Sequence, residues 1–76
     1  MNVKVKKIWT DENAVYIKTD EGKVYAEFFN HYPRLRQANQ TQRRRFDYDN
    51  LGIHWEELDE DLSYEGFLHT NKCIAL

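Results

Sequence analysis

The chain has 76 residues, a single cysteine and a net charge of −2, and 41% of its residues are hydrophobic. This length permits one domain that buries about 60 to 65% of its unfolded surface, so the core is small. No segment reaches the roughly 20 apolar residues needed to span a bilayer. One cysteine excludes a disulfide framework within the chain and is typical of a reducing compartment. We therefore expect a cytoplasmic protein that makes no contact with a membrane.

The charges are segregated along the chain. Residues 31–46 contain five arginines and no acid, whereas residues 47–66 contain eight acids and neither lysine nor arginine. A basic middle followed by an acidic third is typical of a chain with charged interaction surfaces. This distribution indicates more about possible binding than the small net charge does.

The first half of the chain reads as three strands. Val3 and Val5 alternate with lysines, and Ile8 has the opposite parity, which predicts a β-bulge near Lys6. Residues 14–19 and 23–29 then form a hairpin around Gly22, which can adopt the positive φ of a tight turn.

We expect the hairpin register to place Asp20 opposite Lys23. In this register the pairs are Thr19 with Val24, Ile17 with Ala26, and Val15 with Phe28. The opposite face would then carry Tyr16, Lys18, Tyr25 and Glu27.

Short helical segments are expected after residue 29. Pro33 suits the first turn of one helix, and Thr41 is placed to cap a second helix that ends near Phe46. Residues 53–55 alternate as in a short strand, and Ser63, or Asp61 before it, can cap a last helix.

The fold class expected is therefore α+β: a small three-stranded antiparallel sheet (β-β-β) followed by short helices in a two-layer domain. The single domain spans residues 1–68, and residues 69–76 form a disordered C-terminal tail. The predicted core packs four sheet residues against five helical ones: Val15, Ile17, Ala26 and Phe28 against Leu35, Ala38, Phe46, Leu62 and Phe67.

The stretch from Gly52 to Ser63 alternates apolar residues with the densest run of acids in the chain. It resembles the closing motif of a family of short bacterial proteins, the "domain of unknown function 2442" family. The segment Tyr32-Pro33-Arg34-Leu35 and the Asp20–Lys23 turn are also similar to that family. The resemblance covers residues 3–68, and Glu56 departs from it where relatives often have proline.

The resemblance implies a three-stranded antiparallel sheet packed with short helices. It supplies no catalytic residues. Some relatives look fused to a helix-turn-helix domain; the sequence ends before such a domain could begin, so we do not expect DNA binding through one. Others are encoded beside another small protein, an arrangement that suggests a toxin–antitoxin-like pair.

The residues favour a binding role over chemistry. We expect a non-enzymatic protein-interaction module, the antitoxin-like or accessory half of a two-protein operon, that meets a partner with a basic surface. We call the expected contact residues the acidic segment: Glu56, Glu57, Asp59, Glu60 and Asp61.

Two alternatives use the arginines. A nucleic-acid-binding or transcription-accessory domain would contact phosphates through Arg34, Arg36, Arg43, Arg44 and Arg45. The acids that follow would repel nucleic acid. Alternatively, the basic middle of one copy would dock on the acidic third of another and form a homo-oligomer.

Metal binding and catalysis are more specific interpretations of these residues, with less support from the sequence. Asp59, Asp61, Glu57 and His54 have the ligand types of a hard cation site, but helix capping explains the acids equally well. No serine or cysteine nucleophile is visibly placed beside a histidine. We therefore expect no catalytic residues, no metal site and no cofactor.

Overall fold

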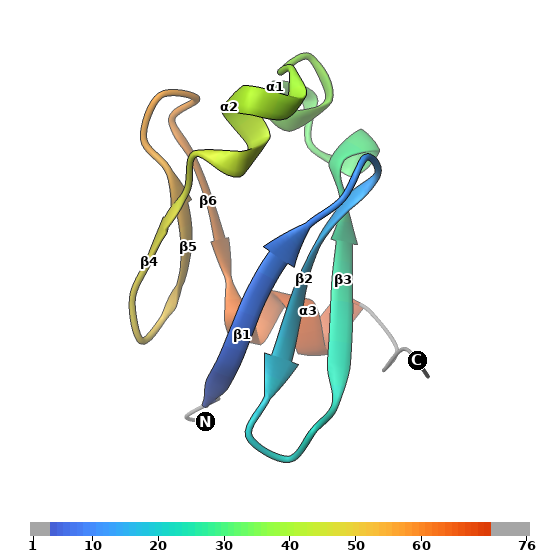
Figure 1. The fold of residues 1–76 in the computed structure, drawn as a ribbon, viewed down its shortest axis with the longest axis vertical. Helices are drawn as coiled ribbons and strands as arrows, with labels where there is room; N and C mark the ends of the chain where they lie inside the picture. The colour runs from blue at the N-terminus through green and yellow to red at the C-terminus, as the bar shows by residue number, and fades with distance from the viewer. Residues whose placement is uncertain (1–3, 71–76) are drawn as a thin grey trace.

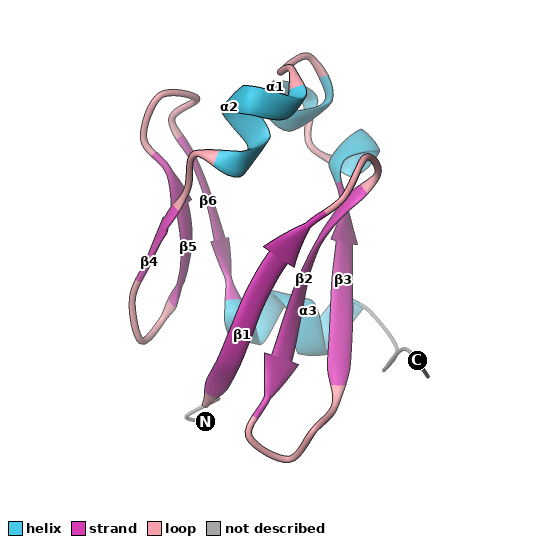
Figure 2. Cartoon of the chain, viewed as in Figure 1, coloured by secondary structure: helices cyan, strands magenta, loops and turns pink. Residues whose placement is uncertain are grey.

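The computed structural model describes residues 4–70 and contains two small antiparallel sheets and short helices (Figures 1 and 2). This confirms the α+β class. The first sheet has the order β1 (Val5–Thr10), β2 (Ala14–Thr19) and β3 (Val24–Phe28). The second has the order β4 (Asp47–Tyr48), β5 (Gly52–Trp55) and β6 (Glu60–Ser63). The helical elements are the 3-10 turn η1 (Phe29–His31), α1 (Pro33–Arg36), α2 (Gln40–Arg44) and α3 (Tyr64–Thr70).

The helices join and close the two sheets. Figure 1 shows α1 and α2 bridging the sheets at one end of the molecule, and α3 behind the first sheet at the other end. Pro33 occupies the first turn of α1, as expected. Ser63 caps α3, because its Oγ accepts a hydrogen bond from the Gly66 N–H at 3.0 Å. None of the helices within residues 4–70 is long and apolar enough to cross a bilayer.

The predicted cap of α2 is wrong. Asn39, not Thr41, caps this helix through a reciprocal capping box with Gln42: the Asn39 Oδ1 accepts from the Gln42 N–H at 2.8 Å, and the Gln42 Oε1 accepts from the Asn39 N–H at 3.0 Å. The Asn39 and Gln42 side chains together satisfy two otherwise orphan N–H groups. Thr41 cannot form such a pair, because the residue three positions later is Arg44, whose side chain has no acceptor.

The predicted bulge in β1 is confirmed by a register shift between Val5 and Lys7. The predicted register of the β2–β3 hairpin is wrong by one residue. The loop has three residues rather than two: the Thr19 N–H donates to the Lys23 carbonyl, and Gly22 takes a φ of 84°. This is the three-residue turn with a left-handed glycine in its last position.

The one-residue slip changes which β3 side chains face the core. Tyr25 and Glu27 pair with Ile17 and Val15 on the inner face. Ala26 and Phe28, which we expected in the core, lie instead on the outer face of the sheet. Ala26 is buried there, and Phe28 is 44% exposed.

The core lies between the two sheets, η1, α1 and α3. Val15, Ile17, Leu35, Leu62 and Phe67 are buried in it, as expected. Its remaining buried members are Phe29, Ile53, Trp55 and Tyr64. Leu62 lies in β6 rather than in a helix, and Phe46 lies in the connection between α2 and β4 and packs against the core from its edge. The prediction of Ala38 as a helical core residue is wrong, because it is half-buried in the bend between α1 and α2 and lies outside the core.

The second sheet is the main feature that the sequence analysis did not contain. Asp49 closes the β4–β5 turn, since its Oδ1 accepts from the N–H groups of Leu51 and Gly52 at 2.8 and 3.0 Å. At the C-terminus, His69 and Thr70 belong to α3, whereas the rest of the predicted tail, residues 71–76, lies outside the described residues.

We predict that Gly52→Ala destabilises the domain strongly. A Cβ at this position would collide with the backbone of β6, at the Leu62 carbonyl and 2.9 Å from the Ser63 Cα. Neither atom can move without disturbing the sheet. Urea denaturation should show a loss of at least about 2 kcal/mol in the free energy of unfolding.

Gly66→Ala is the matched control. The nearest atom to its added Cβ is the Ser63 Oγ at 3.1 Å, the end of a side chain that can rotate. A Gly52→Ala protein as stable as the Gly66→Ala protein would contradict the close approach of β5 and β6.

Candidate functional site

The acidic segment forms the turn between β5 and β6 and the first half of β6. Glu56 and Glu57 begin the turn, and Asp59 has a φ of 52°, in the left-handed region. Glu60 is half-buried opposite Trp55, and Asp61 points outward opposite His54. The expected contact residues therefore face different directions and are not one surface.

Two acids of this turn are paired with the chain's own arginines. Arg34 of α1 donates to the Asp59 carbonyl and lies 3.4 Å from the Asp59 Oδ2. Arg45 lies 3.6 Å from the Glu57 Oε2, and Gln42 donates to the Glu57 Oε1 at 2.9 Å. The basic middle and the acidic third thus meet within one molecule.

Arg43 has a structural position. Its Nε donates to the Leu35 carbonyl at 2.9 Å and its Nη2 to the Arg36 carbonyl at 3.0 Å. Its guanidinium lies over the Phe29 ring at 4.6 Å. The Arg43 carbonyl in turn accepts a hydrogen bond from the Trp55 Nε1 at 2.9 Å. This side chain holds the fold together and is not presented to a phosphate.

The remaining arginines do not complete a cationic surface. Arg44 donates to the Gln40 carbonyl at 3.3 Å, and Arg36 is exposed on α1. With Arg43 anchored and Arg34 and Arg45 paired with acids, the five arginines do not act as one patch. No observation in residues 4–70 specifically favours the nucleic-acid alternative.

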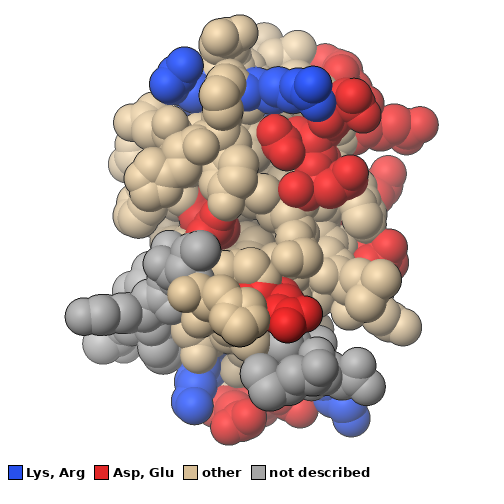
Figure 3. Space-filling model, turned by 180° about the vertical axis from the view of Figure 1, so that it is seen from behind, with Lys and Arg blue, Asp and Glu red and all other residues tan. Residues whose placement is uncertain are grey.

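Carboxylates gather on the outer face of the second sheet. Figure 3 shows them over this sheet, with lysines and arginines beside them at the helical end of the molecule. We call this surface the acidic face and define it by four exposed residues: Asp47, Asp49, Glu56 and Asp61.

His54 lies at the centre of the acidic face, on β5 between β4 and β6. Its cross-strand neighbours are Asp47 and Asp61. Its Nδ1 lies 2.7 Å from the Asp61 Oδ1, and its Nε2 lies 2.8 Å from the Asp49 Oδ2. Two carboxylates can both accept from the ring only when both nitrogens carry protons, so the geometry favours the imidazolium.

The pKa values follow from this arrangement. The hydrogen bonds with Asp61 and then Asp49 raise the pKa of His54 above its ordinary value. The pKa of Asp49 is lowered, first by the hydrogen bond from the Leu51 N–H and then by that from His54. The charged forms of both groups are therefore stabilised by folding.

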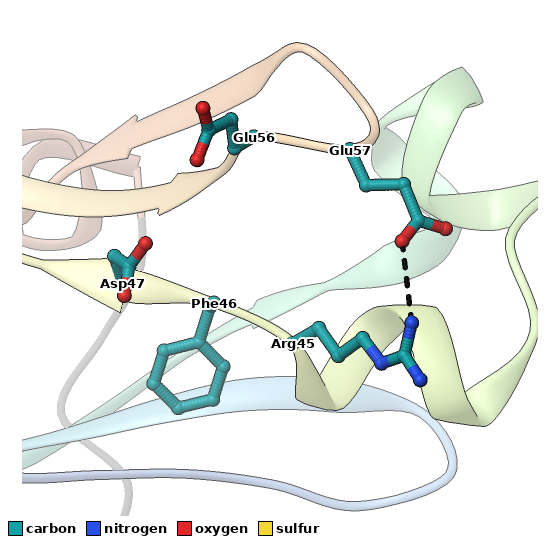
Figure 4. A pocket seen from close by; sticks show the side chains of 5 residues that line it. All are labelled: Arg45, Phe46, Asp47, Glu56 and Glu57. Carbon is teal, nitrogen blue, oxygen red and sulfur yellow. Dashed lines mark ion pairs between the residues drawn. The ribbon is translucent and has the colours of Figure 1, made fainter.

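Asp47 and Glu56 are the uncompensated members of the acidic face. Within residues 4–70, no lysine or arginine forms an ion pair with either of them. They line a shallow depression of about 470 Å³ beside the Arg45–Glu57 ion pair. Figure 4 shows the two carboxylates on either side of this space, Asp47 on β4 and Glu56 just after β5. A basic side chain from another molecule would meet both.

The four residues with the ligand types of a hard cation site do not come together as one group. His54 contacts Asp61 but binds Asp49 rather than Asp59 or Glu57. In the part of the chain that the structure describes, no group of three or more His, Cys, Asp or Glu side chains has the arrangement of a metal site.

Asp47 and Asp49 were missed as surface residues. Their alternation around Tyr48 is the only local signal of β4, which is two residues long. A strand this short is below the length at which alternation identifies a strand.

We predict that Arg43→Lys destabilises the domain by about 1 to 3 kcal/mol, because an ammonium cannot reproduce the forked hydrogen bonds to two carbonyls. Arg44→Lys, on the exposed side of the same helix, should change the free energy of unfolding by less than about 0.5 kcal/mol. Urea denaturation measures both. Equal losses in the two variants would show that Arg43 has no anchoring role.

We predict that His54 makes stability depend on pH. Because its pKa is raised on folding, its contribution is fully present below the unfolded value of about 6.5 and is lost as pH rises through the folded value. The melting temperature of the wild type should therefore fall more steeply than that of His54→Gln between about pH 6 and pH 8. NMR titration should place the pKa of His54 above that of a free imidazole. Parallel melting curves for the two proteins across this range would contradict the two-carboxylate arrangement.

Comparison with known proteins gives one result. A family model described as "Protein of unknown function (DUF2442)" matches residues 5–72, which confirms the resemblance seen in the sequence. Comparisons with curated proteins and with solved structures find no match. The chain therefore belongs to the DUF2442 family of proteins of unknown function.

Proposed function

We propose that this chain is a non-enzymatic protein-interaction module that binds a basic protein partner through the acidic face. The observation that carries the proposal is the pair Asp47 and Glu56. Both are exposed and without an ion-pair partner in residues 4–70; Asp47 lies in β4, and Glu56 directly follows the neighbouring strand β5. Glu57 and Asp59 contribute less, since Arg45 and Arg34 already offset their charge.

Apolar anchors lie in the same hairpin. Tyr48 and Leu51 are 66% and 75% exposed, and both belong to β4 or the turn that follows it. With Val5, Tyr64 and polar neighbours they line a groove of about 570 Å³. Large exposed apolar side chains beside a charged rim have the composition of a protein interface.

The two features have separate roles in the proposed mechanism. The negative field of the acidic face would steer a basic partner and raise the association rate. Burial of Tyr48 and Leu51 would slow dissociation, which is where most affinity differences arise. The arrangement of genes implied by the family resemblance makes the product of an adjacent gene the partner to test, with this chain as its accessory or antitoxin-like half.

The test measures the affinity of the purified product of the adjacent gene by calorimetry. We predict that the double variant Asp47→Lys, Glu56→Lys binds at least about tenfold more weakly than the wild type, because reversed charges repel a basic surface. Circular dichroism confirms that the variant is folded.

Asp20→Lys, Glu21→Lys is the matched control, with the same change in net charge at the exposed β2–β3 turn. It should bind like the wild type. Equal losses of affinity in the two double variants would show that only the net charge of the chain matters. Unchanged affinity in both variants would refute the role of the acidic face.

A further inference from the structure

On the outer face of the first sheet, the side chains form three rows that run across the strands. The register places Trp9, Tyr16 and Ala26 in a central row. On one side lies the row Lys7, Lys18 and Val24, and on the other lies the row Asp11, Ala14 and Phe28. The Asp11 N–H donates to the Ala14 carbonyl, which extends the β1–β2 pairing by one row.

This face is apolar at its centre, and no helix of residues 4–70 packs on it. Trp9 stacks on Tyr16 with ring centroids 5.3 Å apart, and neither residue belongs to the core between the sheets. In Figure 1 the helices of residues 4–70 lie behind the sheet or beyond its end, so none of them covers this face. Trp9 and Tyr16 are half-buried, while Phe28 and the two lysines at the edges of the face are exposed. An apolar patch with charged edges is typical of an interaction surface.

The basic row has an unfavourable arrangement in a single molecule. Lys7 and Lys18 are directly opposite each other on neighbouring strands, and like charges in this relation repel. No carboxylate within residues 4–70 forms an ion pair with either lysine. Lys7 lies over the Trp9 ring at 5.3 Å. The row is therefore complementary to a carboxylate from outside the molecule.

We propose that this face binds a second copy of the chain and forms a two-fold symmetric, face-to-face dimer. The two-fold axis lies between the first sheets of the two copies. It runs perpendicular to the strands, along the Trp9–Tyr16 row. This rotation reverses the strand direction, so the basic row of each copy lies over the acidic row of the other.

The pairings created by this axis are favourable from edge to edge. Lys7 faces Asp11 of the second copy, whose carboxylate is held in place by the Tyr16 hydroxyl at 2.6 Å and by the Asn13 and Ala14 N–H groups. Val24, which is only 5% exposed in the single molecule, faces Phe28, which is 44% exposed. The aromatic row packs on itself. A two-fold axis along the strands would instead place Lys18 against Lys18 of the second copy and Lys7 against Val24, with no lysine against a carboxylate, so charge selects the first arrangement.

The size of the face sets the expected strength. Three strands spaced about 4.8 Å apart and five residues long, with a rise of about 3.4 Å each, offer a contact of only a few hundred Å². This is below the area of a standard interface, so the dimer should be weak and visible only in concentrated solution.

Sedimentation equilibrium of the full chain at rising concentration tests the proposal. The average mass should rise from 9.2 kDa toward twice that value and should not exceed it. Lys7→Glu places a like charge against Asp11 of the second copy and should weaken association at least about tenfold. Phe28→Ser, an exposed position that should not disturb folding, should also weaken it.

Lys23→Glu is the control. Lys23 is exposed in the β2–β3 turn, outside the three rows, and the variant has the same net charge as Lys7→Glu. It should associate like the wild type. A protein that stays monomeric up to about 1 mM overturns the proposal, as does growth beyond a dimer. Loss of association in the Asp47→Lys, Glu56→Lys variant, but not in Lys7→Glu, would assign self-association to the acidic face instead.

Discussion

Arg43 makes the contacts on which the arrangement of the two sheets depends. Its side chain donates to carbonyls at the end of α1 and lies over the Phe29 ring, and its backbone carbonyl accepts a hydrogen bond from the Trp55 indole of the second sheet. Phe29 follows the first sheet directly and Trp55 ends β5. One residue of α2 therefore connects the first sheet, the short helices and the second sheet. In a chain with so small a core, these contacts between elements matter more than the stability of any single element.

The same connection decides how charge is presented to solvent. Bringing α1 and α2 against the β5–β6 turn pairs Arg34 with Asp59 and Arg45 with Glu57. Both pairs are exposed and add little to stability. Their larger effect is on the surface potential, since they offset the turn and leave Asp47 and Glu56 as the uncompensated carboxylates. The acidic segment of the sequence and the acidic face of the structure are thus different sets that share Glu56 and Asp61.

The sequence alone predicts the structure correctly where the signal is local and strong. Alternation in residues 14–19, the proline of α1 and the serine cap of α3 all predicted what the structure contains. It was insufficient where geometry depended on a single residue or on distant contacts. A two-residue and a three-residue loop around Gly22 are equally readable in the sequence, yet they place Ala26 and Phe28 on opposite faces. The second sheet depends on β4, whose two residues carry almost no pattern, and on the Asp49 side chain that closes its turn. The role of Arg43 could not be predicted, because its partners are carbonyl groups and a ring that the sequence does not bring together.

The order of the strands in both sheets has a consequence for how the chain folds. Each strand pairs with the one that follows it, in the orders β1-β2-β3 and β4-β5-β6, and no strand crosses from one sheet to the other. Hairpins of this kind close short loops and form within microseconds. The slower event is then the docking of one completed hairpin pair on the other, when Trp55 and Ile53 reach Val15 and Ile17. Contact order is low within each sheet, and only the docking of the two sheets brings distant residues together. We therefore expect the domain to fold fast for a protein rich in β-structure.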